Sequence, residues 1–316
     1  VTNAGKITTN GITVTNSSIG GSIVDTGVLV GGIKVDATSM IAATATAATD
    51  VAIAVTGSTF SGGISNGGTL SGGGGTSTSV AQPIILIDGV SRFAGGILNT
   101  GSIVASTRDS FQQRAILIEN VSTFSGGIAN SGTISVPGSQ RLSLAAILVT
   151  DFSVFQNGIS NGGVITGPGA GYAIVVQGTA GATGVHNNLL NKGVFAGGIT
   201  NSGSISGFPT AGVNVVSVSS FSGNIVNANG GLISAEPVTG VPGQGIAVAN
   251  VLTFAGNISN AGTILTGGVG IVVAGVSDVA PVSFLCAISN SGTISGGVEI
   301  GIAVAGLATP SSGISN

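Results

Sequence analysis

The sequence predicts an all-β fold: a right-handed parallel β-helix of about ten three-strand coils, each roughly 30 residues long, forming a single domain over residues 1–316. Three observations predict it. A glycine-rich phrase recurs down the chain, a short apolar run precedes most copies, and no segment has the capped 3.6-residue periodicity of a helix. The right-handed winding follows the general preference of parallel crossovers, and a left-handed solenoid is the alternative.

The recurring phrase is "FSGGISNGGTL", and its clearest copy begins at Phe60. A degenerate first copy, "IGGSIVDTGVL", begins at Ile19. Self-similarity at a nearly fixed spacing is typical of solenoids, in which each repeat packs against its neighbours. The phenylalanines that open the copies are Phe60, Phe93, Phe124, Phe155, Phe195, Phe221, Phe254 and Phe284.

Each coil is expected to contain three strands. The first is the apolar run, such as "PIILID" at 83–88, which has the length and aliphatic content of a buried strand. The second is the Phe-x-Gly-x-Ile segment, in which Phe60, Gly62 and Ile64 share one parity and should point inward. Glycine there would leave room for the ring. The third is the Gly-Thr-Ile segment that follows.

An asparagine follows the isoleucine by two residues in nearly every copy. Asparagine tolerates the left-handed conformation of sharp corners, and its amide can bond the same residue one coil away. We therefore expect a corner that carries an asparagine ladder beside the phenylalanine column. The ladder residues are Asn66, Asn99, Asn130, Asn161, Asn201, Asn227, Asn260 and Asn290.

The composition excludes several classes of protein. Hydrophobic residues make up 42% of the chain, which argues against disorder, and the 57 glycines follow no Gly-X-Y period, which excludes collagen. No run of eighteen apolar residues exists, so no membrane-spanning helix is expected. The 7 basic residues are scattered, which argues against nucleic acid as a partner. With charged residues at only 5%, the surface must consist largely of Ser, Thr, Asn and Gly.

Runs such as "GGISNGGTLSG" and "NISNAGTILTG" resemble the I-x-N-x-G-x-I repeats of bacterial autotransporter passenger domains and related surface β-helix proteins. The resemblance extends over residues 19–316. It implies an extracellular protein displayed on a bacterial cell surface, with a structural role as a filament subunit, adhesin or stalk. It names no receptor, although a host or surface ligand is compatible with such a role.

The chain offers little catalytic chemistry, so we expect neither an enzyme nor a cofactor or metal. His186 has no acid or nucleophile near it in sequence and is interpreted as an exposed loop residue. Cys286 replaces the inward glycine of one Phe-x-Gly motif and is interpreted as a small buried apolar residue.

An acidic column is the exception. Asp88 and Glu119 each lie five residues before their phenylalanine, and Asp151 lies four before its own. We interpret the three as a solvated stripe offset by Arg92 and Arg114. The alternative is a polysaccharide-degrading enzyme that uses stacked carboxylates from adjacent coils.

Ice binding is a third hypothesis, because some flat solenoids present ranks of threonine. Here one position per coil carries Thr69, Thr133, Thr263 and Thr293, but the regular two-threonine rank is missing.

The two ends of the chain suggest a partner. The opening "VTNAGKI" and the closing "SSGISN" both read as parts of the corner phrase, which makes Val1 and Asn3 equivalent to Ile314 and Asn316. Such ends would stack head to tail on further copies of the chain without a change of register. A contact of this kind does not close, so it generates an open filament.

Overall fold

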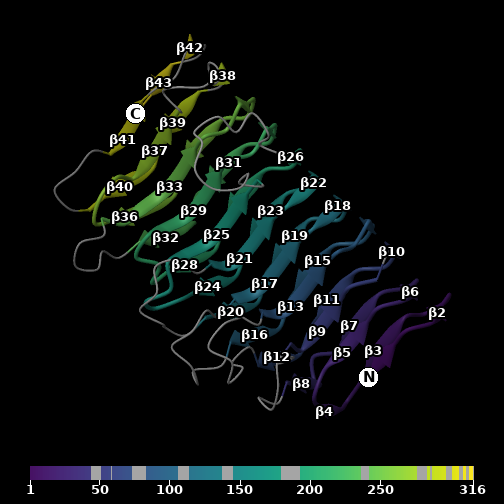
Figure 1. Ribbon diagram of the computed structural model, residues 1–316. Helices are drawn as coiled ribbons and strands as arrows, with labels where there is room; N and C mark the ends of the chain where they lie inside the picture. Colours follow the sequence, from purple (N-terminus) through teal and green to yellow (C-terminus); the bar gives the residue numbers. More distant parts are fainter. Residues whose placement is uncertain are drawn as a thin grey trace.

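The computed structural model is an all-β parallel solenoid, and no helix occurs among the residues that it describes. Successive coils stack along one axis, with the N-terminus at one end and the C-terminus near the other (Figure 1). The structure describes residues 1–43, 51–57, 59–72, 83–105, 114–136, 145–178, 193–235, 242–275, 283–284, 287–296, 301–305, 309–310 and 313–315.

Four parallel sheets, A to D, run along the solenoid, and the chain adds one strand to each in turn, the last strand of sheet D being β40 (Thr293–Ser295). Sheets A, B and C have 11 strands and sheet D has 10. Sheet A contains β1 (Thr2–Asn3), β5 (Ile23–Asp25), β9 (Ile53–Val55), β13 (Pro83–Asp88), β17 (Arg114–Glu119), β21 (Ala145–Thr150), β25 (Tyr172–Gln177), β29 (Ala211–Val216), β33 (Gln244–Ala249), β37 (Ile271–Ala274) and β41 (Ile302–Ala305).

Sheet B contains β2 (Lys6–Ile7), β6 (Val28–Leu29), β10 (Thr59–Phe60), β14 (Arg92–Phe93), β18 (Val121–Phe124), β22 (Phe152–Phe155), β26 (Val194–Phe195), β30 (Ser220–Phe221), β34 (Thr253–Phe254), β38 (Ser283–Phe284) and β42 (Thr309–Pro310). Sheet C contains β3 (Ile12–Val14), β7 (Ile33–Val35), β11 (Ile64–Asn66), β15 (Ile97–Asn99), β19 (Ile128–Asn130), β23 (Ile159–Asn161), β27 (Ile199–Asn201), β31 (Ile225–Asn227), β35 (Ile258–Asn260), β39 (Ile288–Asn290) and β43 (Ile314–Ser315). Sheet D contains β4 (Ser18–Gly20), β8 (Met40–Ala42), β12 (Thr69–Gly72), β16 (Ser102–Ala105), β20 (Thr133–Ser135), β24 (Val164–Thr166), β28 (Ser204–Ser206), β32 (Leu232–Ala235), β36 (Thr263–Thr266) and β40 (Thr293–Ser295).

The predicted fold is confirmed, but the coil has four strands rather than three and the stack has eleven coils rather than ten. The extra strand comes from the glycine pair of the phrase. Phe60 ends β10 and Ile64 begins β11, so Gly62 and Gly63 form a corner between sheets B and C, not the middle of one strand. Eleven coils at the usual interstrand spacing give a rod about 50 Å long. The right-handed winding stays a prediction.

The core is one continuous cluster inside the four sheets, and period-two alternation builds it. In β13, Ile85 and Ile87 are fully buried while Leu86 between them faces outward. In sheets C and D a single isoleucine or leucine per strand points inward, as Ile64 and Leu70 do. Since strands pair in register with the same residue types above and below, each inward position becomes a longitudinal column.

Candidate functional site

An asparagine ladder at the corner between sheets C and D is the most regular polar feature of the molecule. Each side-chain Nδ2 donates to the Oδ1 of the asparagine one coil further on, at 2.7–2.8 Å. The direction never changes along the stack. The rungs are, as the sequence predicts, Asn66, Asn99, Asn130, Asn161, Asn201, Asn227, Asn260 and Asn290.

Every rung of the ladder except the half-buried Asn290 is buried, and the amides also bind backbone. Asn66 is 1% exposed, and its Nδ2 also approaches the carbonyl oxygens of Gly68 at 3.3 Å and Ser102 at 3.2 Å. Its Oδ1 accepts from the Gly68 amide at 3.2 Å. One predicted detail is wrong: none of the eight asparagines has a positive φ, because each ends a strand of sheet C and keeps extended backbone. The asparagine contributes to the corner through its side-chain hydrogen bonds to the backbone, not through a left-handed backbone conformation.

A phenylalanine column runs through sheet B in parallel with the ladder. The rings of Phe60, Phe93, Phe124 and Phe155 stack with centroids 4.7 Å apart and interplanar angles of 4–11°. The column continues at 4.9–5.1 Å through the coils that follow. All of these rings are fully buried, so the predicted column is present. Its other members are Phe195, Phe221 and Phe254; Phe284 lies in β38 by register, but its side chain is outside the described residues.

In six of the eight copies a glycine lies two residues after the phenylalanine, and the reason for it differs from the predicted one. A Cβ on Gly62 would lie 2.0 Å from the Gly32 nitrogen, and one on Gly95 would lie 1.6 Å from the Gly62 carbonyl oxygen. Neither position is limited by a phenylalanine ring. Glycine is required because the backbones of adjacent coils touch at this corner.

Sequence reasoning missed Phe152, which packs edge-on against the column. Its ring centroid lies 6.2 Å from that of Phe155 and 6.4 Å from that of Phe195, at 72–75°. It occupies the position of Val121 in the coil below. The signal in the sequence was the additional phenylalanine in "DFSVF", the first of the two, three residues before the column phenylalanine.

The acidic residues form a shorter cluster than predicted. Asp88 and Glu119 pair across β13 and β17, but Asp151 lies one position further on, in line with Asn120. Both Asn120 and Asp151 have positive φ, so they belong to the turn between sheets A and B. The Asn120 Nδ2 donates to Asp88 Oδ1 at 2.8 Å.

Burial raises the pKa of Glu119, and the neighbouring carboxylates Asp88 and Asp151 raise it further, while Arg114 opposes the shift. Burial also lowers the pKa of Arg114, whose Nε has no hydrogen-bond partner among the described residues. Across the described part of the chain, no group of three or more His, Cys, Asp or Glu side chains could hold a metal ion.

The first two coils use a different polar arrangement. At the ladder position sheet C carries Val14 and Val35, and the corner is closed instead by Asp36. The Asp36 carboxylate accepts from the Ser39 hydroxyl at 2.6 Å and from the backbone amides of Thr38 and Asn16. The Ser39 hydrogen bond holds the pKa of Asp36 below its ordinary value.

The prediction that the two chain ends occupy equivalent positions is wrong, because they lie in different sheets. Asn3 lies in sheet A, where it pairs with Asp25, whereas Ile314 lies in sheet C, where it pairs with Ile288. The "VTNAGKI" and "IVDTGVL" segments therefore build the corner between sheets A and B, not the ladder corner. Val1 is an exposed residue next to β1, and Asn316 is outside the described residues.

That N-terminal corner is a two-rung copy of the ladder. Asn3 Nδ2 donates to Asp25 Oδ1 at 2.7 Å, and Asn3 Oδ1 accepts from the Gly5 amide at 3.2 Å. Asp25 is fully buried, yet its Oδ2 has no hydrogen-bond partner in the described part of the chain. The next coil continues the column with Val55.

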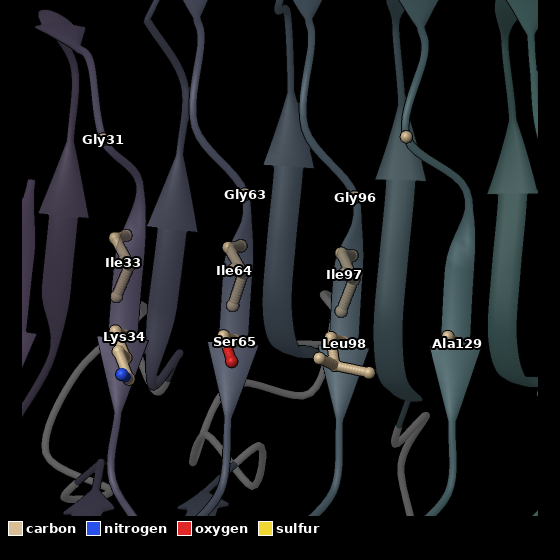
Figure 2. Close-up of a pocket in the computed structure, with 11 residues that line it drawn as sticks. Gly31, Ile33, Lys34, Gly63, Ile64, Ser65, Gly96, Ile97, Leu98 and Ala129 are labelled. Atoms are coloured by element: carbon tan, nitrogen blue, oxygen red, sulfur yellow. The ribbon is translucent and has the colours of Figure 1, made fainter.

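A shallow groove of about 340 Å³ crosses four strands of sheet C, over the glycine corner. Figure 2 shows Lys34, Ser65, Leu98 and Ala129 as a row on successive strands, with the glycines of the corner along one side. Leu98 is 43% exposed. Lys34 is the one titratable residue that lines the groove, so no pair of acid, base or nucleophile converges there.

The predicted threonine row exists on the outer face of sheet D, but it is irregular. Thr69 and Thr133 are separated by Ser102, and Val164 follows Thr133. Thr263 and Thr293 are adjacent further along. His186 and Cys286 lie outside the described residues.

Comparison of the chain with protein-family models, curated proteins and solved structures gave no match. In the described part of the chain, no helix has the length and apolar content needed to cross a membrane.

Proposed function

We propose that this chain is a non-enzymatic structural protein of the extracellular bacterial surface, a stalk or a filament subunit. The observation that supports this most is the unbroken pair of longitudinal columns. Among the described residues, the asparagine ladder runs without interruption from Asn66 to Asn290, and the phenylalanine stack runs from Phe60 to Phe254. A core of this kind favours length and rigidity.

The sparse charge is a second argument. With charged residues at 5%, most of the stability must come from backbone hydrogen bonds, apolar columns and amide ladders. Such interactions depend little on ionic strength, unlike surface ion pairs. A protein outside the cell, where salt and pH vary, benefits from that independence.

Head-to-tail assembly is part of the proposal, in a corrected register. Strands β1–β3 and β41–β43 each pair on one side only, so their other edges can accept parallel strands. A copy placed in line would set β1 on β41 and β3 on β43, which brings Val14 rather than Asn3 over the ladder position. Further coils of the same chain would satisfy these edges equally well.

Two experiments test the proposal. Negative-stain microscopy of the purified chain should show rods about 50 Å long or their linear multiples, and compact or ring-shaped particles would contradict it. Labelling of intact producing cells with a membrane-impermeant reagent should modify the protein without permeabilisation. Labelling only after permeabilisation would contradict an extracellular location.

The alternative hypothesis, that the protein is a polysaccharide-degrading enzyme, can be tested separately. Release of reducing ends from pectin and related glycans, abolished in Asp88→Asn, would overturn the non-enzymatic proposal. The expected result is no release by either the native chain or the variant.

A further inference from the structure

Five asparagines in this chain precede a glycine, the sequence most prone to spontaneous deamidation, because no side chain shields the glycine nitrogen. The same dipeptide thus occurs in five structural settings within one molecule. The five are Asn10–Gly11, Asn66–Gly67, Asn157–Gly158, Asn161–Gly162 and Asn229–Gly230.

Two of these asparagines are rungs of the ladder. Asn66 and Asn161 are each 1% exposed, and their side-chain amides are held by neighbours above and within the coil. The glycine amides that follow are also engaged: Gly67 donates to the Val35 carbonyl at 2.8 Å, and Gly162 donates to the Asn130 carbonyl at 2.7 Å. Neither nitrogen can approach its asparagine side chain without opening the coil.

In two other dipeptides, Asn10–Gly11 and Asn157–Gly158, the asparagine is exposed but the glycine packs against the next coil. A Cβ on Gly11 would lie 2.0 Å from the Gly32 carbonyl oxygen, and one on Gly158 would lie 2.1 Å from the Gly198 carbonyl oxygen. Both backbones are pressed against the next coil, which restricts the rotation that ring closure requires.

Asn229–Gly230 is different, because it is a two-residue insertion in the ladder corner. The side chain of Asn66 reaches the carbonyl two residues on, at Gly68, whereas that of Asn227 reaches the carbonyl four residues on, at Gly231. Both Asn229 and Gly230 are exposed, and no heavy atom lies within 4 Å of a Cβ built on Gly230. On this side of Gly230, therefore, none of the described residues of an adjacent coil is in contact.

A tight turn carries the inserted pair. The Gly231 amide donates to the Ala228 carbonyl at 2.9 Å, and Gly230 has a φ of 81°. This hydrogen bond and the one from Asn227 Nδ2 to the Gly231 carbonyl span the insertion, and neither involves a polar group of Asn229 or Gly230.

We propose that Asn229 is a site of spontaneous deamidation and isoaspartate formation in the folded protein, and that the ladder protects the same dipeptide at Asn66 and Asn161. The Gly230 backbone nitrogen attacks the side-chain carbonyl carbon of Asn229. A new C–N bond forms, the bond to the amide nitrogen breaks, and ammonia leaves. Water then opens the cyclic imide on one side or the other, giving aspartate or isoaspartate.

The consequence is an added negative charge on a chain whose formal net charge is −3. Isoaspartate also lengthens the backbone, but only within the insertion. Asn227 and its hydrogen bond to Asn260 at 2.7 Å are left in place. Modification would therefore mark the surface of the rod without breaking its ladder.

Incubation of the folded full-length chain at mildly alkaline pH, followed by peptide mapping with mass spectrometry, tests this. Asn229 should convert at least about tenfold faster than Asn66 or Asn161, because those two must first open a coil. Isoaspartate-specific methyl labelling should appear in the same peptide, and Asn229→Gln should remove it there.

The chain unfolded in guanidinium is the matched reference. There the peptides that contain Asn66, Asn161 and Asn229 should convert at similar rates. Equal rates in the folded chain would overturn the proposal. Conversion of Asn229 only after unfolding would overturn it as well.

Discussion

Replacing Asn130 by alanine removes one rung from the middle of the ladder and should destabilise the protein by about 2–3 kcal/mol. This figure follows from the hydrogen bonds that the substitution removes. Asn130 Oδ1 accepts from Asn99 Nδ2 at 2.7 Å, and Asn130 Nδ2 donates to Asn161 Oδ1 at 2.7 Å. Each lost bond contributes about 1 kcal/mol net, and a buried partner left unsatisfied costs about 1–3 kcal/mol.

The isosteric Asn130→Asp should cost more than alanine. It places an oxygen where the Nδ2 faces three acceptors: Asn161 Oδ1, and the carbonyls of Gly132 and Val164 at 3.3 Å. The aspartate oxygen would then face only other acceptor oxygens, with no hydrogen between them, and a buried polar atom without a hydrogen bond is destabilising. Ser131→Ala, at the exposed neighbouring residue, is the control and should change stability by less than about 0.5 kcal/mol.

Urea unfolding followed by circular dichroism measures all three variants. The expected order of midpoints, from highest to lowest, is native and Ser131→Ala together, then Asn130→Ala, then Asn130→Asp. A midpoint for Asn130→Ala that matches the control, or an aspartate variant as stable as the alanine variant, would refute the ladder as a source of stability.

Four further changes follow from the same contacts. Phe124→Ala should cost about 3–5 kcal/mol in the same unfolding assay, since a ring stacked on both sides leaves a cavity, and no loss would contradict the column. Gly95→Ala should prevent soluble expression, because its Cβ would overlap backbone, whereas Gly20→Ala, with nothing within 4 Å, should fold normally. Asp25→Asn should raise the unfolding midpoint, because it replaces a fully buried carboxylate, whose Oδ2 has no partner among the described residues, by an uncharged side chain; a lower midpoint would show that the carboxylate is needed. Glu119 has a folded-state pKa above the ordinary 4.5, so its favourable contribution is present at acid pH and is lost as pH rises through the raised value. Glu119→Gln should therefore reduce the loss of stability that accompanies a rise in pH above about 4.5, and an unchanged profile would contradict this.

The ladder and the phenylalanine column could be predicted from the sequence because their spacing from the corner is constant. Asn66 and Asn99 each lie two residues after an inward isoleucine, and Phe60 and Phe93 lie four before it. In-register stacking then places like residues on like residues, and the hydrogen bond between the two asparagines at 2.8 Å follows.

The fourth strand could not be predicted from residue parity. In a strand, Gly62 would be a small inward residue between Phe60 and Ile64, and the sequence alone does not distinguish that from a corner. The deciding fact is a contact between coils: the backbone of Gly62 lies against that of Gly32. Such a contact depends on register, which no single repeat specifies.

The sequence-based placement of the acidic and N-terminal residues was wrong for a related reason. The same corner chemistry, a polar side chain two residues before a glycine, is used between sheets A and B by Asn3 and Asp25 and between sheets C and D by Asn66. Local sequence identifies a corner but not which corner. Asp151 lies one position further on because it is four residues before its phenylalanine, whereas Asp88 and Glu119 are five before theirs, and the turn has the same length in these three coils.

Engineered disulfides test the in-register stacking of the coils most directly. Ser65 and Leu98 face outward from β11 and β15 and are direct partners across the two strands. Cysteines at 65 and 98, in a chain whose own cysteine is replaced by serine, should oxidise to an intramolecular disulfide, because adjacent strands lie about 4.8 Å apart. Cysteines at 65 and 129, two coils apart and about 10 Å from each other, should stay reduced. A disulfide in the second pair and not in the first would contradict the stacking that this account requires.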